Sequence, residues 1–210
     1  MTERPRLLVG LTGGLAAGKS TVASLLAERG CKVFDADRLV ADLYGAGEPG
    51  AERVRELFGD SVLDAEGAVD HRALGGRVFA DGEARRRLEE AIHPLVGDRF
   101  RELASRETGI VVLEATLLVE AGWADAFDLL VTVEASSEAR LARAVARGLA
   151  PEEAARRLAA QGEGEARRAA AHRMIRNDGD RAELERQVDA LVRDLRRLLA
   201  GDTPPPTQRP

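Results

Sequence analysis

The segment that most constrains the fold of this chain is glycine-rich and lies at residues 13–20, where the sequence reads Gly-Gly-Leu-Ala-Ala-Gly-Lys-Ser. An apolar run at residues 7–11 precedes it and predicts a short buried strand. Residues 19–29 follow with apolar side chains at helical spacing, and a second short apolar segment occupies residues 31–34. A strand, loop, helix and strand in this order form a βαβ unit, so the sequence predicts an α/β fold with a parallel sheet.

The spacing of this segment matches G-x-x-x-x-G-K-[ST], a pattern whose backbone wraps around phosphate groups. Its glycines let the N–H groups turn inward, and the helix that begins at Lys19 adds the positive end of its dipole. Lys19, one of only two lysines in the chain, is expected to act catalytically on the β- and γ-phosphates of ATP, and Ser20 to bind Mg²⁺. The predicted ATP-binding residues of the loop are Gly13, Gly14, Ala16, Ala17, Gly18, Lys19, Ser20 and Thr21.

A phosphate loop alone does not fix the reaction, because kinases, GTPase switches and motor ATPases share it. A guanine-specific GTPase usually carries an Asn-Lys-x-Asp motif, whereas the only asparagine here, Asn177, is followed by Asp178. A motor ATPase or transporter subunit usually needs a longer chain than 210 residues. The sequence therefore favours a small-molecule kinase, with the other two classes as alternatives.

Acidic residues follow two of the expected strands, at the sheet edge where ligands bind in α/β folds. Asp35 and Asp37 come after the second strand, and we expect Asp37 to accept the proton of an attacking hydroxyl while Asp35 has a structural role. Glu114 ends the apolar run at residues 110–113, which is the Walker-B arrangement for holding Mg²⁺. The alternative for Glu114 is a buried structural carboxylate.

Composition excludes several other classes of protein. The net charge of −5 and the seven aromatic residues argue against nucleic acid as a partner. No run of 18 apolar residues exists, and no signal peptide is recognisable at the N-terminus, so we expect no membrane span and a cytoplasmic location. A single cysteine, Cys31, fits a reducing compartment, and we expect it to be a buried strand residue.

The rest of the chain predicts three more strands, at residues 110–115, 128–134 and 173–177. Helical patterns occupy residues 137–147, 151–161 and 188–199, and most of residues 38–106, which we read as a helical insertion between the second and third strands. We expect one kinase domain over residues 1–200, with its core at residues 7–37, 108–146 and 172–200. The Pro-rich residues 201–210 predict a disordered tail.

Six motifs occur in the order of a known family, and together they are far more specific than the phosphate loop. Besides residues 11–21 and Asp-Ala-Asp at 35–37, they are Ile-His-Pro-Leu at 92–95, Leu-Leu-Val-Glu at 117–120, Leu-Ala-Ala-Gln at 158–161 and Met-Ile-Arg-Asn at 174–177. Over residues 7–200 the chain resembles the dephospho-CoA kinases. The resemblance implies a three-layer P-loop kinase fold with a five-stranded parallel sheet, a helical acceptor insertion and a helical lid.

The resemblance also implies the reaction and its partners. They are ATP-dependent phosphorylation of the ribose 3′-hydroxyl of dephospho-CoA, the last step of coenzyme A synthesis, with Mg²⁺, by a monomer or weak homo-oligomer. The insertion at residues 38–106 would form the CoA-binding helices, with Asp37 as the base, and residues 147–171 a lid over ATP. Arg143, Arg147 and Arg167 match basic positions of the family, whose guanidinium groups could stabilise the phosphoryl group during transfer.

Three further residues match the family pattern, and several depart from it. Asn177 falls at an adenine-side contact, and Arg72 and His93 at acceptor-side positions. The family usually has proline at position 116, a polar or acidic residue at 148, aspartate at 172 and Gly-Ser at 16–17. Here these residues are Thr116, Gly148, His172 and Ala16-Ala17. None of these departures removes a charge that the reaction needs.

Overall fold

A computed structural model describes residues 6–79, 81–162 and 164–202 of the chain. From residue 203 onward, the tail predicted to be disordered lies outside the described residues. The chain divides into two compact units. We call Met1–Phe34 with Glu107–Pro210 the sheet unit, and Asp35–Arg106 the helical unit.

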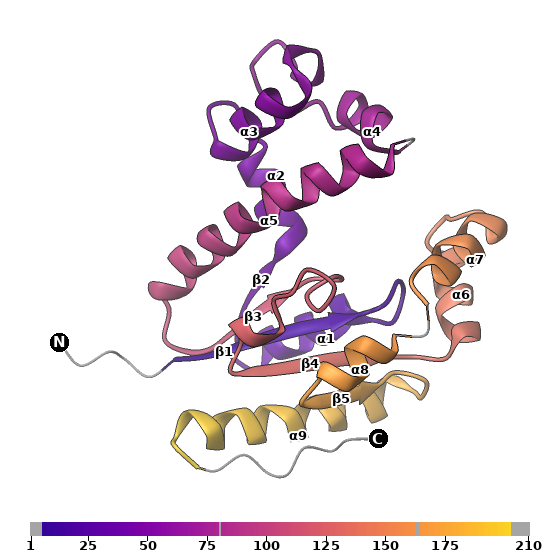
Figure 1. Cartoon of the computed structure of the whole chain (residues 1–210). Helices are drawn as coiled ribbons and strands as arrows, with labels where there is room; N and C mark the ends of the chain where they lie inside the picture. Colours follow the sequence, from indigo (N-terminus) through magenta and orange to yellow (C-terminus); the bar gives the residue numbers. More distant parts are fainter. Residues whose placement is uncertain (1–5, 80, 163, 203–210) are drawn as a thin grey trace. The chain divides into compact units, whose positions relative to one another are not determined.

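The predicted five-stranded sheet is present (Figure 1). Its strands are β1 (Arg6–Gly13), β2 (Lys32–Asp35), β3 (Gly109–Glu114), β4 (Leu129–Glu134) and β5 (Arg173–Arg176). They lie in the order β2-β3-β1-β4-β5, and β1 runs parallel to both β3 and β4, as β4 does to β5. Cys31 is buried as expected, but it lies one residue before β2, so its assignment to a strand was wrong.

This strand order places a topological switch point beside β1. The chain leaves β1 for the edge strand β2, returns to β3 on the same side, and then crosses to β4 on the other side. In open α/β sheets, ligands bind outside the carboxyl ends of the strands at such a reversal. The end of β1 is Gly13, the first residue of the phosphate loop.

The sheet is covered on both faces, which confirms the predicted layers. The helices of this unit are α1 (Lys19–Glu28), α6 (Ser137–Ala146), α7 (Pro151–Ala160), α8 (Glu165–Ala170) and α9 (Arg181–Leu199). On one face, α1 and α9 pack against alternate residues of β1, including Val9 and Leu11. On the other face, Leu118 and Phe127 from the β3–β4 connection approach Gly10, and α8 contacts β4. Burying both faces accounts for the nearly continuous apolar runs of the strands.

The helical unit consists of α2 (Ala36–Leu43), α3 (Pro49–Phe58), α4 (His71–Phe79) and α5 (Gly82–Ser105), with a short 3₁₀ turn at Asp60–Val62. The long helix α5 contacts each of the other three. Its buried residues recur every four positions, at Ile92, Val96, Phe100 and Ala104, so a single apolar stripe forms the centre of this unit.

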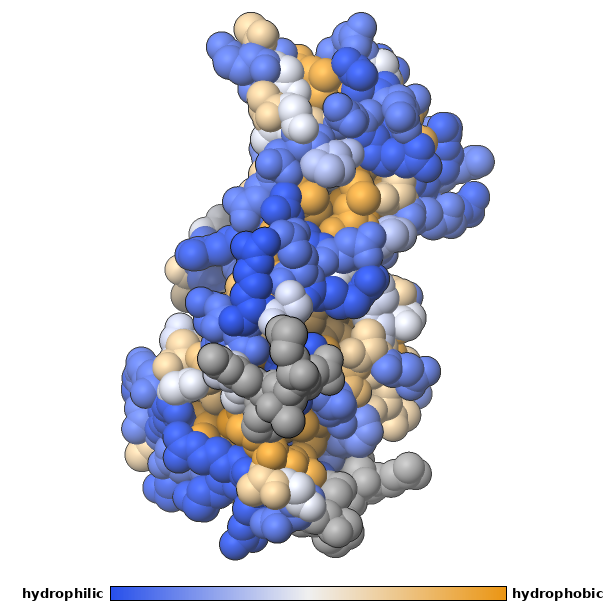
Figure 2. All heavy atoms as spheres, turned by 90° about the vertical axis from the view of Figure 1, so that its left-hand side faces the viewer, coloured by the Kyte–Doolittle hydropathy of each residue, from blue (hydrophilic) through white to orange (hydrophobic). Residues whose placement is uncertain are grey.

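The outer surface is largely hydrophilic on the face drawn in Figure 2, with smaller hydrophobic areas between the polar side chains of each unit. That agrees with the high content of charged residues, 32%. None of the helices in the described part of the chain is long and apolar enough to cross a membrane.

Candidate phosphate-binding site

The phosphate loop joins β1 to α1, and its shape depends on glycine at position 18. Gly18 has φ 104°, and a Cβ atom there would lie 2.0 Å from Nδ2 of Asn177. Any other residue would combine an unfavourable backbone conformation with a clash. Ala16 has a positive φ of 57°, which costs an L-residue about 1–2 kcal/mol. The Ala16-Ala17 departure from the family pattern is therefore accommodated at the cost of some strain.

Lys19 is the first residue of α1, and its Nζ lies 3.5 Å from the carbonyl oxygen of Gly14. The first turn of α1 contains no acidic residue. The positive end of the helix dipole therefore remains available to an anion, together with the lysine charge.

Ser20 and Glu114 lie next to each other, although 94 positions separate them in the sequence. The Ser20 hydroxyl donates to Oε1 of Glu114 at 3.0 Å, which connects the start of α1 to the end of β3. Magnesium in nucleotide sites is usually held by one or two protein oxygens, phosphate oxygens and water. These two side chains fit that requirement. No larger cluster of potential metal ligands exists among the described residues.

The carbonyl groups of the loop are bonded from behind by side chains that are distant in sequence. Nδ2 of Asn177 donates to the Ala17 oxygen at 2.8 Å, and Arg143 Nη1 lies 3.5 Å from the same oxygen. Arg143 also donates through Nη2 to the Asn177 carbonyl at 2.6 Å. The structure thus brings these two predicted residues to the loop backbone; their predicted contacts with ATP stay predictions. Arg147 is the exposed C-terminal cap of α6.

Arg140 and Gln161 also contact the loop, and our sequence analysis missed them. Arg140 Nε donates to the Leu15 oxygen at 2.9 Å, and the Leu15 N–H donates to Oε1 of Gln161 at 2.7 Å. Gln161 belongs to the Leu-Ala-Ala-Gln motif, which was the available signal. Arg140 gave no signal among the many arginines of residues 138–176. Burial, and secondarily the positive charge of Arg167, lower the pKa of Arg140, while Glu134 acts in the opposite direction.

Arg167 lies behind this region and is almost completely buried, with 1% of its surface exposed. Its Nη1 forms an ion pair with Oε1 of Glu120 at 2.5 Å. In the described part of the chain its Nε and Nη2 have no hydrogen-bond partner. Glu120, the acid of the Leu-Leu-Val-Glu motif, therefore provides the carboxylate that pairs with this buried charge.

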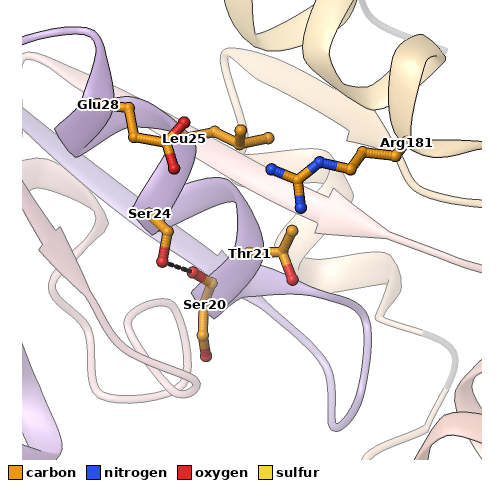
Figure 3. Close-up of a pocket in the computed structure, with 6 residues that line it drawn as sticks. All are labelled: Ser20, Thr21, Ser24, Leu25, Glu28 and Arg181. Atoms are coloured by element: carbon orange, nitrogen blue, oxygen red, sulfur yellow. Dashed lines mark hydrogen bonds between the residues drawn. The ribbon is translucent and has the colours of Figure 1, made fainter.

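A pocket of about 340 Å³ opens beside the start of α1 (Figure 3). Ser20, Thr21, Ser24, Leu25 and Glu28 line it from α1, and Arg181 extends toward them from the start of α9. The pocket adjoins the predicted magnesium ligand and has polar groups of both charges.

In the helical unit, the structure confirms the structural role expected of Asp35. Its Oδ1 accepts from the Asp37 N–H at 2.9 Å and so caps α2. Asp37 is the exposed second residue of that helix. Arg72 lies on α4, exposed, and His93 lies on α5, half-buried. The predicted acceptor residues are thus on three different helices of this unit.

Three residues outside the predicted site have structural roles that the sequence did not reveal. Nδ1 of His172, which we took for a surface histidine, accepts from the Leu130 N–H at 3.0 Å. His71, also taken for a surface histidine, lies 5.6 Å from the Tyr44 ring, whose pKa burial raises to about 12. Thr116 accepts a hydrogen bond from the Thr12 hydroxyl through its backbone carbonyl, which a proline would also supply.

A glycine-rich loop at the end of the central strand, with backbone groups held from behind and a Ser–Glu pair beside it, defines a P-loop nucleotide-binding protein of the kinase type. Known proteins make the assignment narrower. The dephospho-CoA kinase family model matches residues 7–183, and the chain therefore belongs to the dephospho-CoA kinase family.

Individual relatives agree with this assignment. The chain is 44% identical to the dephospho-CoA kinase of Streptomyces avermitilis, covering 90% of this chain and 94% of that one. It is also 44% identical to the dephospho-CoA kinase of Methylococcus capsulatus, covering 93% and 100%. The crystal structure of TT1252 from Thermus thermophilus is 37% identical and superposes with a TM-score of 0.77, over 90% and 98% of the two chains. The dephospho-CoA kinase from Campylobacter jejuni, at 22% identity and a TM-score of 0.61 over 90% and 97%, supports the fold alone.

Proposed function

We propose that this chain transfers the γ-phosphoryl group of ATP to the ribose 3′-hydroxyl of dephospho-CoA, giving coenzyme A and ADP in the last step of coenzyme A synthesis. One observation carries the proposal: a complete phosphate loop lies at the switch point of a chain that matches dephospho-CoA kinases over residues 7–183. The other substrate-related residues are consistent with it but are less specific.

In this proposal the loop residues 13–21 bind the ATP phosphates, and Lys19 neutralises charge on the β- and γ-phosphates. Ser20 and Glu114 hold Mg²⁺, which supplies further positive charge at the phosphates. Asn177 and Arg143 act from behind the loop, where their hydrogen bonds to Ala17 lie, and Arg147 extends from the end of α6 to the nucleotide.

Asp37 accepts the proton of the ribose hydroxyl and orients the oxygen for in-line attack. Its position as an exposed residue in the first turn of α2 leaves its carboxylate accessible to a substrate. Arg72 and His93 bind the acceptor, since a basic and a polar ring side chain suit the phosphate and adenine of dephospho-CoA. Residues 38–106 are the acceptor insertion, and residues 147–171 are the lid that excludes water during transfer.

The cell biology that we propose follows from the substrates. Both are small water-soluble molecules, so we propose a cytoplasmic enzyme without a nucleic-acid or membrane partner, as a monomer or weak homo-oligomer.

The test is a coupled ADP-release assay with dephospho-CoA, AMP and gluconate as separate acceptors. We expect turnover with dephospho-CoA only. Turnover with AMP or gluconate alone would indicate a different small-molecule kinase. Slow hydrolysis of ATP that no acceptor accelerates would indicate a nucleotide-dependent switch.

A further inference from the structure

The tip of the phosphate loop is held by two side chains that also bond to each other. Arg140 Nε donates to the Leu15 carbonyl at 2.9 Å, and Gln161 Oε1 accepts from the Leu15 N–H at 2.7 Å. Arg140 Nη2 donates to the same Gln161 oxygen at 3.1 Å and closes a three-membered network. Both backbone polar groups of Leu15 are therefore satisfied from behind the loop.

These bonds fix the orientation of two peptide groups. In a trans peptide, the carbonyl of one residue and the N–H of the next point in opposite directions, and the described chain has no cis peptide. Because Arg140 holds the Leu15 carbonyl, the Ala16 N–H must point away from Arg140. By the same reasoning, the bond from Asn177 to the Ala17 carbonyl turns the Gly18 N–H away from Asn177. The donors of the loop are thus aimed before any anion arrives.

The network is packed tightly enough to have a single arrangement. Arg140 is 5% exposed, and a Cβ atom at Gly14 would lie 2.3 Å from Arg140 Nη2, so only glycine allows this approach. Below the hydrogen bonds, Ala16 packs with Ala144 of α6 and Ala154 of α7 in a small apolar cluster. Gln161 ends α7, inside the region that we propose to be the lid. The α6–α7 pair therefore contacts the back of the phosphate loop through both apolar and polar groups.

We propose that Arg140 and Gln161 are positioning residues that aim the loop N–H groups at the polyphosphate of the nucleotide, without touching it. All three nitrogen-to-oxygen bonds of the network end on Leu15 or within the network, so the effect of these side chains passes through the Leu15 backbone. The inference rests on the proposed nucleotide-binding function and adds to it the residues that shape the loop.

The test measures the binding of magnesium tripolyphosphate by calorimetry, because this probe has phosphates but no adenosine. Arg140→Met and Gln161→Met should each weaken binding about 10-fold, since each removes a hydrogen bond that involves a charged group or a loop amide. The double variant should lose clearly less than the product of the two, because both side chains act on one peptide segment. In turnover, KM for ATP should rise while KM for dephospho-CoA stays within about twofold.

Two further variants separate positioning from charge and from general stability. Arg140→Lys keeps the positive charge but cannot reproduce both bonds, so it should bind tripolyphosphate nearly as weakly as Arg140→Met. Arg157→Met removes an exposed arginine of α7 that pairs with Glu153, and it should bind like the wild type. If Arg140→Met does not fold, the half-exposed Gln161→Met carries the test against Arg157→Met.

The proposal is overturned if Arg140→Lys binds like the wild type, if the two losses multiply fully, or if Gln161→Met binds like Arg157→Met. A wild-type protein that binds tripolyphosphate but does not phosphorylate dephospho-CoA would refute the proposed acceptor and leave this test readable.

Discussion

The two units of the molecule arrange their candidate functional groups in different ways. In the sheet unit, the phosphate loop is held by Arg143 and Asn177, which lie 126 and 160 positions away from Ala17 in the sequence. In the helical unit, the backbone N–H groups of Asp37 and Arg72 each bond to a carboxylate only two positions earlier. The first site is built by tertiary structure, whereas the second presents exposed side chains on locally capped helices.

This difference suggests how the two substrates are recognised. A polyphosphate offers many equivalent oxygens, which a rigid ring of backbone N–H groups can bind in one fixed geometry. An extended acceptor requires several separate contacts, and side chains from α2, α4 and α5 can supply them. We therefore expect substitutions in the sheet unit to impair phosphate binding and transfer, and substitutions in the helical unit to act on the acceptor.

The largest expected effect is that of Lys19→Met. Removing the ammonium group should lower kcat/KM for ATP by about 10²–10³-fold, the range found when one preorganised donor to transition-state charge is lost. The chain provides a matched control in its only other lysine, Lys32, which pairs with Glu107 at 3.1 Å. Steady-state kinetics should show Lys32→Met within about threefold of the wild type. Equal losses in both variants would mean that Lys19 has no special part in catalysis.

Asp37→Asn should come next and should separate the two units. It should lower kcat by about 10²-fold, as expected of a general base, while the Kd for ATP stays within about twofold. Asp35→Asn is the control, because its amide oxygen can still accept from the Asp37 N–H and cap α2. Single-turnover kinetics and ATP titrations measure both quantities. A kcat for Asp37→Asn within about threefold of the wild type would remove Asp37 as the base.

The sequence predicted what depends on local pattern. The strands, the phosphate loop and the helical segment between β2 and β3 all follow from apolar spacing and glycine position, so they were readable without tertiary information. Asp35 could be assigned a structural role because a capping side chain acts on residues two positions away.

The sequence failed where a role depends on a distant partner. Nothing in the surroundings of Arg140 or His172 distinguishes them from surface residues, because their partners are the backbone of Leu15 and of Leu130. Gly148 was a departure that the sequence did not explain, and the structure shows it at φ 96° directly after the cap of α6, where glycine commonly ends helices.

A smaller effect, on stability, is expected at the buried ion pair of the sheet unit. Glu120→Gln would leave the Arg167 guanidinium buried without a counter-charge, which should lower the free energy of unfolding by about 1–3 kcal/mol. Glu153→Gln breaks an exposed pair with Arg157 and should cost less than about 1 kcal/mol. Chemical denaturation of both variants gives the comparison. Equal costs would mean that burial adds nothing to the Glu120–Arg167 interaction.

The smallest effect should appear in the helical unit, at the cap of α4. Hydrogen bonds from the backbone N–H groups of Ala73 and Arg72 lower the pKa of Asp70, because they stabilise its ionised form. A carboxyl group with a lowered pKa in the folded state stabilises the protein above its unfolded pKa of about 3.9, and this contribution is lost as the pH falls through the folded value. Asp70→Asn keeps an oxygen that can cap the helix but does not titrate.

Thermal melts of the wild type and Asp70→Asn should therefore differ by a few degrees at pH 6 and converge as the pH is lowered toward 3. Because the cap acts on α4 alone, ATP binding by the sheet unit should be the same in both proteins at pH 7. A difference in Tm that stays constant with pH would show that the carboxylate charge is irrelevant to the cap. A change in ATP affinity would show that a local cap in the helical unit influences the phosphate loop, contrary to the division of roles proposed for the two units.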